Sequence, residues 1–253
     1  MTQVYSEIYG NGPPLVMLHG WAMHSGVWRD FALRLAQRYR VICLDLPGHG
    51  RSAMCGATDL DEICEVLMRA IPERSCHLLG WSLGGTLVMA MAERFPERVD
   101  KVVVLAGNPK FVQADDWPGI RPDTLEAFAD LLRRDVQQTL TRFLALQVNG
   151  LPHGKVLLNV LKQALQECPA AADAALAIGL QILKSADLRG FLLQNQVPTA
   201  LIFGDKDTLI PVACATVLKR LNPRLQVSVL ASAGHLPFLT HADELVELIV
   251  SHL

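Results

Sequence analysis

The sequence predicts an α/β fold with a mostly parallel central sheet, helices on both faces and an inserted all-helical cap. Short β-branched apolar runs alternate with helical patterns over the first 110 residues and again after residue 187, as in sheets covered by crossover helices. These runs are continuously apolar, which is typical of strands buried on both faces. The stretch between them shows helical periodicity only. We therefore predict a core at 1–110 and 188–253 and a cap at 111–187.

The core elements follow in order along the chain. The stretch "VYSEIYG", followed by Asn11-Gly12 and Pro13-Pro14, predicts a hairpin at the sheet edge. Buried strands are then predicted in "LVMLHG", "RVICLDL", "CHLLGW" and "KVVVLAG", with helices at 27–38, 59–71 and 83–95 between them. After the cap, strands are predicted in "PTALIFGDKD" and "LQVSVLASAGH", each followed by a helix, at 211–220 and 241–252.

The cap is predicted to contain helices at 123–134, 136–148, 155–167 and 171–184. Prolines lie near their junctions, where proline tends to begin or end a helix; these are Pro118, Pro122, Pro152 and Pro169. No comparable strand pattern occurs in this stretch. The predicted cap therefore interrupts the α/β alternation without adding to the sheet.

Composition restricts the classes of function. The 253 residues are 51% hydrophobic and 19% charged, as in ordinary globular proteins. A net charge of -2 gives no overall attraction to nucleic acid or to an anionic membrane. The start lacks a secretory signal pattern, and no apolar run approaches the roughly 18 residues of a membrane span. The six cysteines form no C-x-x-C pair, so we expect reduced thiols in the cytoplasm.

The stretch "GWSLGG" places Ser82 where a buried strand runs directly into a helix. Such a sharp turn brings backbone close to backbone, so small residues are needed at Gly80 and Gly84. The turn lifts the Ser82 hydroxyl above the sheet edge, and the helix that begins at Leu83 directs its free N–H groups toward a bound group. This is the nucleophile-elbow pattern G-x-S-x-G. The alternative is a serine that caps the helix.

A serine nucleophile needs a base to take its proton and a third group to orient that base. In this architecture the order along the chain is Ser, acid, His, each after a strand. Asp207 and His235 fit that order, and of the eight histidines only His235 follows a strand after the candidate acid. Asp205 is the alternative acid, but its place directly after Gly204 suits the turn, so we favour Asp207.

The tetrahedral intermediate of acyl transfer needs donors for its oxyanion. We assign one to the backbone N–H of Leu83 and the other to the backbone of Trp21, in the early loop "HGWAM". His19 has either a packing or a catalytic role there. The stretch "DLPGHGRS" at 45–52 is interpreted as a supporting loop, and Asp45 is not expected to be the catalytic acid.

With "HGW", "DLPGHGRS", "GWSLGG", "GDKD" and the final "GH" in this order, the chain resembles the α/β-hydrolase superfamily over nearly its whole length. Its elbow carries serine where dehalogenases and epoxide hydrolases carry aspartate, which disfavours both reactions. The stretches "GWSLGG", "DDWPGIRPD" and "RFLALQ" look like those of a narrower family. Its members are carboxylesterases of biotin biosynthesis that remove the methyl group from pimeloyl-acyl-carrier-protein methyl ester.

This resemblance implies a substrate with an acyl chain, a terminal methyl ester and a phosphopantetheine thioester on an acyl-carrier protein. It implies an acyl pocket lined by Trp21, Ser82, Leu83, Phe143, Leu144, Ala145, Leu146, Gln147 and His235. It requires no metal and no organic cofactor. The alternatives are a generalist esterase or thioesterase that takes small esters without a carrier, and a hydrolase-like binding protein without useful turnover.

Charge along the cap supports a carrier partner. From 133 to 162, Arg133, Arg134, Arg142, Lys155 and Lys162 stand against Asp135 alone, which gives +4 and leaves -6 for the rest of the chain. A basic face on an acidic protein suits an acidic partner, although a solvated helix surface is the alternative. By the resemblance, Arg142, Lys155 and Lys162 are the candidate carrier contacts, whereas Gln138 and Asn159 are uncharged where the family can be basic. We expect a monomer.

Overall fold

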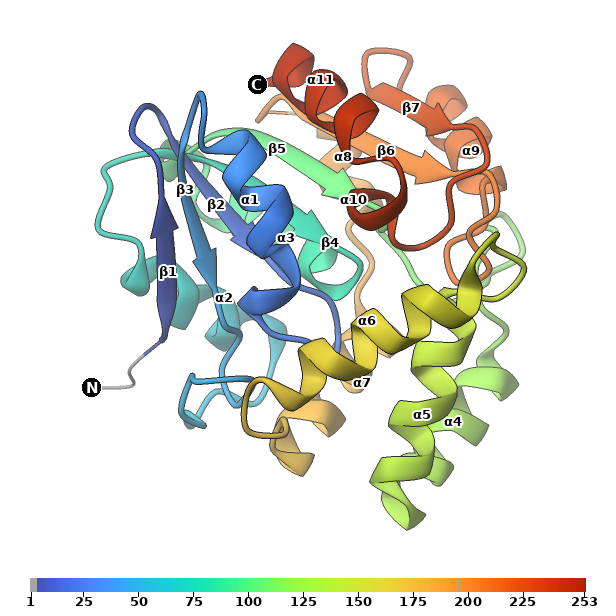
Figure 1. Ribbon diagram of the computed structural model, residues 1–253. Coiled ribbons are helices and arrows are strands. Elements are labelled where there is room, and N and C mark those ends of the chain that lie inside the picture. Colours follow the sequence, from blue (N-terminus) through green and yellow to red (C-terminus); the bar gives the residue numbers. More distant parts are fainter. Residues whose placement is uncertain (1–3, 195) are drawn as a thin grey trace.

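A seven-stranded sheet forms the centre of the molecule in the computed structural model, which describes residues 4–194 and 196–253 (Figure 1). Its strand order is β1-β3-β2-β4-β5-β6-β7, and only β1 runs antiparallel to its neighbour. The strands are β1 (Ser6–Tyr9), β2 (Pro14–Leu18), β3 (Arg40–Leu44), β4 (Cys76–Trp81), β5 (Val99–Leu105), β6 (Thr199–Gly204) and β7 (Gln226–Leu230). The mostly parallel sheet that the sequence predicts is confirmed.

The first strand corrects the predicted hairpin. β1 lies at the sheet edge, as predicted, but it pairs with β3, with Ser6 opposite Leu44, and not with β2. The last four residues of β2 are fully buried, so this strand takes an interior position between β3 and β4. The turn after β1 crosses the backbone that precedes β3. Gly10 has φ +70° there, and a Cβ on it would lie 2.3 Å from the Ala36 carbonyl oxygen.

Helices cover both faces of the sheet, and β2 shows how the core is divided. Val16 and Leu18 pack in the layer that holds α2 (Leu60–Ala70), α3 (Leu83–Arg94) and α9 (Ala213–Leu221). Leu15 and Met17 point the other way, into the layer that holds α1 (Arg29–Leu35), α10 (Pro237–Thr240) and α11 (Ala242–His252). Alternate side chains of one strand thus fill two cores.

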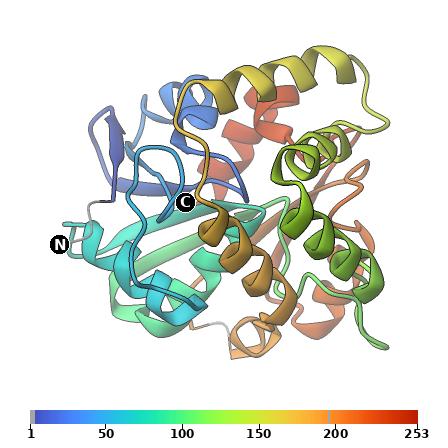
Figure 2. The same ribbon diagram turned by 90° about the horizontal axis from the view of Figure 1, so that it is seen from below.

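The cap consists of α4 (Pro122–Arg134), α5 (Val136–Gln147), α6 (Gly154–Gln166) and α7 (Asp173–Ser185), all between β5 and β6. Each helix agrees with its predicted range to within two residues at either end. In Figure 1 the arrowheads of β2, β3 and β4 point toward these helices, and Figure 2 looks onto them from below. The cap therefore lies over the edge at which the parallel strands end. The short helices η1 (Ser25–Trp28), η2 (Pro96–Arg98) and α8 (Arg189–Gln194) complete the fold.

Two global expectations can be compared with the described residues. All six cysteines are free thiols, so there is no disulfide framework among them. Within 4–194 and 196–253, no helix is long and apolar enough to cross a membrane.

Candidate active site

Ser82 occupies a sharp turn between β4 and α3. Its backbone has φ 56° and ψ -117°, a region that residues with a side chain rarely adopt. A Cβ on Gly80 would lie 2.1 Å from the Gly84 carbonyl oxygen, and a Cβ on Gly84 would lie 2.3 Å from the Leu18 carbonyl oxygen. Only glycine fits at these two positions. Ser82 directly precedes α3, at the N-cap position, but its side chain makes no capping hydrogen bond among the described residues, so the geometry does not support a simple helix cap.

His235 and Asp207 form a buried pair beyond the ends of β7 and β6. The His235 Nδ1–H donates to Asp207 Oδ2 at 2.9 Å, and the two side chains are 1% and 0% exposed. Asp207 Oδ1 accepts from the backbone N–H groups of Leu209 at 2.8 Å and Ile210 at 3.0 Å. These bonds fix the carboxylate, which in turn fixes the imidazole. His235 Nε2 is buried and has no hydrogen-bond partner in the described part of the chain, so its lone pair is free to accept a proton.

Trp81, the residue before Ser82, brings the elbow against the His235 loop. Its Nε1–H donates to the His235 carbonyl oxygen at 2.8 Å, and the two rings are 5.6 Å apart between centroids. Trp81 itself packs edge-on against Trp28 and Phe238. The candidate nucleophile, base and acid therefore lie at one edge of the sheet. Asp205 does not bond to His235, and its backbone N–H donates to the Leu230 carbonyl oxygen at 3.2 Å, as a turn residue would.

The loop after β2 runs directly beside the elbow. A Cβ on Gly20 would lie 3.2 Å from the Cβ of Ser82 and 3.0 Å from the Trp81 ring. The next residue is Trp21, whose backbone N–H is the predicted oxyanion donor. Leu83, the other predicted donor, is the first residue of α3 and is buried. Both candidate donors are thus adjacent to Ser82.

His19 connects this loop to the supporting loop at 45–52. Its Nδ1–H donates to the Gly20 carbonyl oxygen at 2.8 Å, and its Nε2 accepts from the Leu46 N–H at 2.9 Å. Burial, together with the nearby His49 ring, lowers the pKa of His19 to about 3. With both nitrogens engaged, the neutral ring acts as a bridge. Asp45 is also occupied, because it accepts from the N–H groups of Ser25 and Arg51 at 2.6 and 2.8 Å.

An apolar cavity of about 180 Å³ lies between the cap and the loop after β6. It is lined by Trp21, Phe111, Ile120, Thr124, Leu125, Phe128, Phe143, Leu146, Leu180, Leu183, Thr208 and Leu209. The Phe143 and Phe128 rings meet Trp21 edge-on, at centroid distances of 4.9 and 5.5 Å. The last two lining residues directly follow Asp207, so the cavity adjoins the candidate acid. It suits an aliphatic chain.

The cavity includes only part of the predicted acyl pocket. Phe143 and Leu146 line it, but Leu144 is buried in the core layer of α1 and Ala145 faces solvent. Successive residues of a helix point in different directions, so five consecutive residues of α5 cannot share one face. Gln147 is 2% exposed, and its amide atoms have no partner in the described chain. The lining residues of α4 and α7 were not predicted, although the apolar face of each cap helix is a signal for them.

The predicted carrier contacts lie on the outside of the cap. Arg142 on α5 and Lys155 and Lys162 on α6 are exposed, and none forms an ion pair with a residue that the structure describes. Arg133, by contrast, pairs with Asp130. Over the described ranges, no cluster of three His, Cys, Asp or Glu side chains could hold a metal ion.

Comparison with known families agrees with this architecture. A family model described as the alpha/beta hydrolase fold matches residues 13–242. The chain belongs to the α/β-hydrolase family. Among solved members, an esterase from Exiguobacterium antarcticum has a TM-score of 0.88 at 25% identity and covers 99% of this chain and 95% of its own. An enol-lactonase from Burkholderia xenovorans, with a TM-score of 0.85 at 20% identity over 99% of this chain and 96% of its own, shares the fold.

Nearer relatives place this α/β hydrolase in the narrower family. The pimeloyl-acyl-carrier protein methyl ester esterase of Nitrosomonas europaea is 41% identical over 247 residues, which are 97% of this chain and 98% of that protein. The esterase of that name from Aeromonas salmonicida is 40% identical over 245 residues, 96% of each chain. The chain belongs to this esterase family, and it is a carboxylic ester hydrolase. The resemblance drawn from the motifs is confirmed.

Proposed function

We propose that this α/β hydrolase removes the methyl group from pimeloyl-acyl-carrier protein methyl ester, giving pimeloyl-acyl-carrier protein and methanol in biotin biosynthesis. The observation that carries the proposal is the likeness to esterases of that name over nearly the whole chain, cap included. The apolar cavity beside Trp21 supports it, because a pimeloyl chain is aliphatic between its two ends. The unpaired basic residues of the cap suit an acidic carrier.

In the proposed mechanism, His235 Nε2 takes the proton of Ser82 as the serine oxygen attacks the ester carbonyl carbon. Asp207 holds the imidazole in its orientation and stabilises the imidazolium that forms. The N–H groups of Trp21 and Leu83 donate to the oxyanion. The intermediate collapses, and methanol leaves with the proton from His235. Water then attacks the acyl-enzyme by the same route, and the carboxylic acid and free Ser82 result. No metal or organic cofactor enters this scheme.

The carrier would dock on Arg142, Lys155 and Lys162, and the acyl chain would enter between the cap helices. We take 111–187 as the cap that performs this binding. Gln147 would hydrogen-bond to the substrate, since its buried amide is otherwise without a partner among the described residues. Six free thiols agree with a reducing cytoplasm, where we place the enzyme as a monomer.

The test compares hydrolysis of the carrier-bound methyl ester with that of a free pimeloyl methyl ester, at low and high salt. We expect the carrier-bound form to react faster, and salt to reduce that advantage. The Ser82→Ala variant should lose about 10⁴-fold or more in kcat for both substrates while its circular dichroism is unchanged. Near-native turnover by that variant would falsify the nucleophile assignment.

A generalist esterase is the second candidate, and the uncharged Gln138 and Asn159 on the basic face favour it. It predicts equal rates for the two substrates, no salt dependence, and good hydrolysis of small esters. A binding protein without useful turnover predicts that Ser82 does not react with a serine-directed phosphonate. Either result would replace the proposal above.

A further inference from the structure

The loop that carries the Trp21 N–H is attached to the cap through His24. We call residues 19–25, from the end of β2 to the first residue of η1, the oxyanion loop. His24 is 2% exposed, and its Nε2–H donates to the Ala164 carbonyl oxygen, in the last turn of α6, at 2.6 Å. Its Nδ1 accepts from the Gly26 N–H at 3.1 Å, which fixes the neutral Nε2–H tautomer. Both ring nitrogens therefore have defined partners.

We propose that His24 is a positioning residue for the oxyanion hole. By tying the C-terminal end of α6 to the oxyanion loop, it holds the Trp21 N–H where the developing oxyanion will lie. This inference rests on the proposed function, in which Trp21 is one of the two donors. His24 itself is not a catalytic residue, because its ring is engaged with the backbone of residues 26 and 164.

The oxyanion loop needs such anchors because its own backbone is strained. Ala22 has φ 64°, and the Met23 N–H closes a tight turn on the Gly20 carbonyl oxygen at 3.2 Å. This region of φ is unfavourable for a residue with a side chain, so the turn is held by its surroundings. Removing one anchor would let the turn relax and would displace the Trp21 N–H.

The other anchors lie at different points of the same loop. Trp21 Nε1–H donates to the Leu176 carbonyl oxygen of α7 at 2.9 Å, and the Ser25 N–H donates to Asp45 Oδ1 at 2.6 Å. Of the three contacts made by Trp21, His24 and Ser25, only the hydrogen bond of His24 reaches α6. The oxyanion loop is therefore attached to the cap helices α6 and α7, and through the Ser25 N–H also to Asp45.

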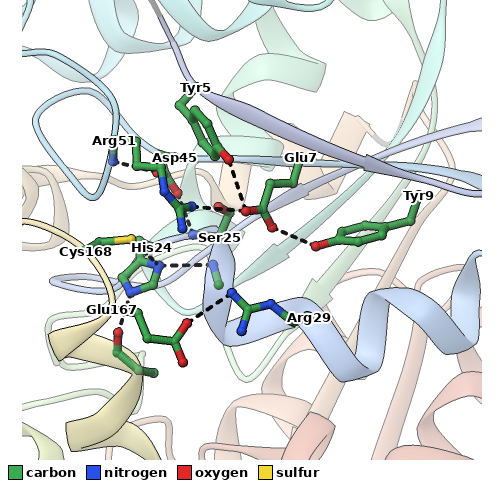
Figure 3. A network of polar contacts seen from close by, with 12 residues as sticks. Tyr5, Glu7, Tyr9, His24, Ser25, Arg29, Asp45, Arg51, Glu167 and Cys168 are labelled. Atoms are coloured by element: carbon green, nitrogen blue, oxygen red, sulfur yellow. Dashed lines mark hydrogen bonds and ion pairs between the residues drawn. The ribbon is translucent and has the colours of Figure 1, made fainter.

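The surroundings are shaped around the His24 ring. A Cβ on Gly26 would lie 2.6 Å from His24 Cε1, and a Cβ on Gly50 would lie 2.7 Å from the His24 Cβ. Figure 3 shows Cys168 next to the ring, with Sγ 3.5 Å from Nδ1, and the Arg29–Glu167 ion pair beside it at 3.0 Å. The ion pair is nearly half exposed, so it contributes little to holding α6. The buried histidine is the stronger attachment.

Two isosteric substitutions separate the two bonds of His24. In His24→Asn the side-chain oxygen still accepts from the Gly26 N–H, but the side chain is too short to reach Ala164. In His24→Gln the amide nitrogen takes the place of Nε2 and restores the bond to Ala164. We expect His24→Asn to lower kcat for a small chromogenic ester about 10-fold with KM almost unchanged, less than the 10²–10³-fold of a lost donor. His24→Gln should recover most of kcat.

Glu167→Gln is the matched control, since it breaks the ion pair at the same end of α6 and leaves His24 intact. It should keep wild-type kcat. A phosphonate ester inactivates the enzyme by phosphonylating Ser82 with loss of its alcohol, and the adduct resembles the tetrahedral intermediate. The rate of this inactivation should fall in His24→Asn by the same factor as kcat. All rates are measured well below the melting temperature of each variant.

A His24→Asn enzyme with wild-type kcat, or a His24→Gln enzyme as slow as His24→Asn, would overturn the proposal. So would a loss of kcat without slower phosphonate inactivation. Ser82→Ala, assayed alongside, distinguishes this failure from failure of the proposed function. If Ser82→Ala is inactive and His24→Asn is fully active, only the role of His24 falls. If Ser82→Ala remains active, both proposals fall.

Discussion

Single residues at the candidate site are held in conformations that most residues avoid. Five residues other than glycine have positive φ in the part of the chain that the structure describes, and four of them, Ala22, Ser82, Ala106 and Ser232, follow the ends of β2, β4, β5 and β7. The fifth, His153, lies at the start of α6. Strain therefore gathers at the edge of the sheet that carries the site. Such strain persists only where the surroundings fix the backbone, and it is typical of active sites.

Two buried histidines, His19 in the oxyanion loop and His49 beside it, predict a dependence of stability on pH. Burial lowers the pKa of His19 to about 3 and that of His49 to about 4, against an ordinary value of 6.5. Below pH 6.5 these two imidazoles bind protons in the unfolded chain but stay neutral in the folded protein. The free energy of unfolding should therefore have its full value above pH 6.5. As the pH is lowered from there toward about 4, it should fall by about 1.4 kcal/mol per pH unit for each ring.

Urea denaturation across this range measures the slope, and His49→Asn provides the comparison. The His49 Nδ1–H donates to the Pro47 carbonyl oxygen at 3.1 Å, and an asparagine amide can make the same bond without titrating. The variant should show a slope smaller by about one proton. An identical slope in both proteins would mean that His49 takes up its proton in the folded state.

At the scale of elements, most strands and helices were predictable from local pattern. The elbow was predictable because the buried run "CHLL" leads into "GWSLGG", whose glycines at 80 and 84 a sharp strand-to-helix turn requires, and α3 begins at Leu83 as expected. The pairing of β1 was not predictable from its turn residues. It depends on β3, which lies beyond α1 in the chain and pairs with β1 on one side and with the buried β2 on the other. The four-residue α10 is too short to show a period.

The cavity lining was less predictable, because it depends on which face each cap helix turns inward. The predicted pocket residues 143–147 are consecutive, so that prediction does not distinguish the inward face of α5 from its other faces. In the structure Phe143 turns toward Trp21, whereas its neighbour Leu144 packs into the core. Adjacent residues of one helix thus differ in function, and this difference can be tested directly.

Phe143→Ala and Leu144→Ala form a matched pair on α5. Phe143→Ala should lower kcat/KM for long-chain methyl esters more than for short ones, because it removes the wall that contacts the chain. Leu144 is 3% exposed, so its truncation should cost about 2–5 kcal/mol of stability and leave the chain-length preference unchanged. The measurements are kcat/KM over a series of ester lengths and urea denaturation. A preference altered by Leu144→Ala, and not by Phe143→Ala, would contradict this arrangement of the cavity.

At the scale of the whole molecule, charge is distributed unevenly. Most basic residues of the core are paired, among them Arg29 with Glu167, Arg51 with Glu7 and Arg189 with Asp187. On the outside of the cap, Arg142, Lys155 and Lys162 are free of ion pairs within the described residues, while the chain as a whole carries -2. A surface of this kind attracts an acidic partner from a distance, and the rest of the protein repels it. The difference between the basic cap and the acidic remainder of the protein would orient the partner as it approaches.

This contrast predicts how charge reversal acts on the carrier-bound substrate. Lys155→Glu should lower kcat/KM for that substrate several-fold at low salt, through slower association, and should weaken the salt dependence. Hydrolysis of a small free ester should be unchanged, since Lys155 is exposed on the outer side of α6. Arg38→Glu changes the net charge by the same amount on an exposed residue after α1, and it should affect neither substrate. Equal losses in the two variants would mean that net charge, and not the position of Lys155 on the cap, governs the encounter.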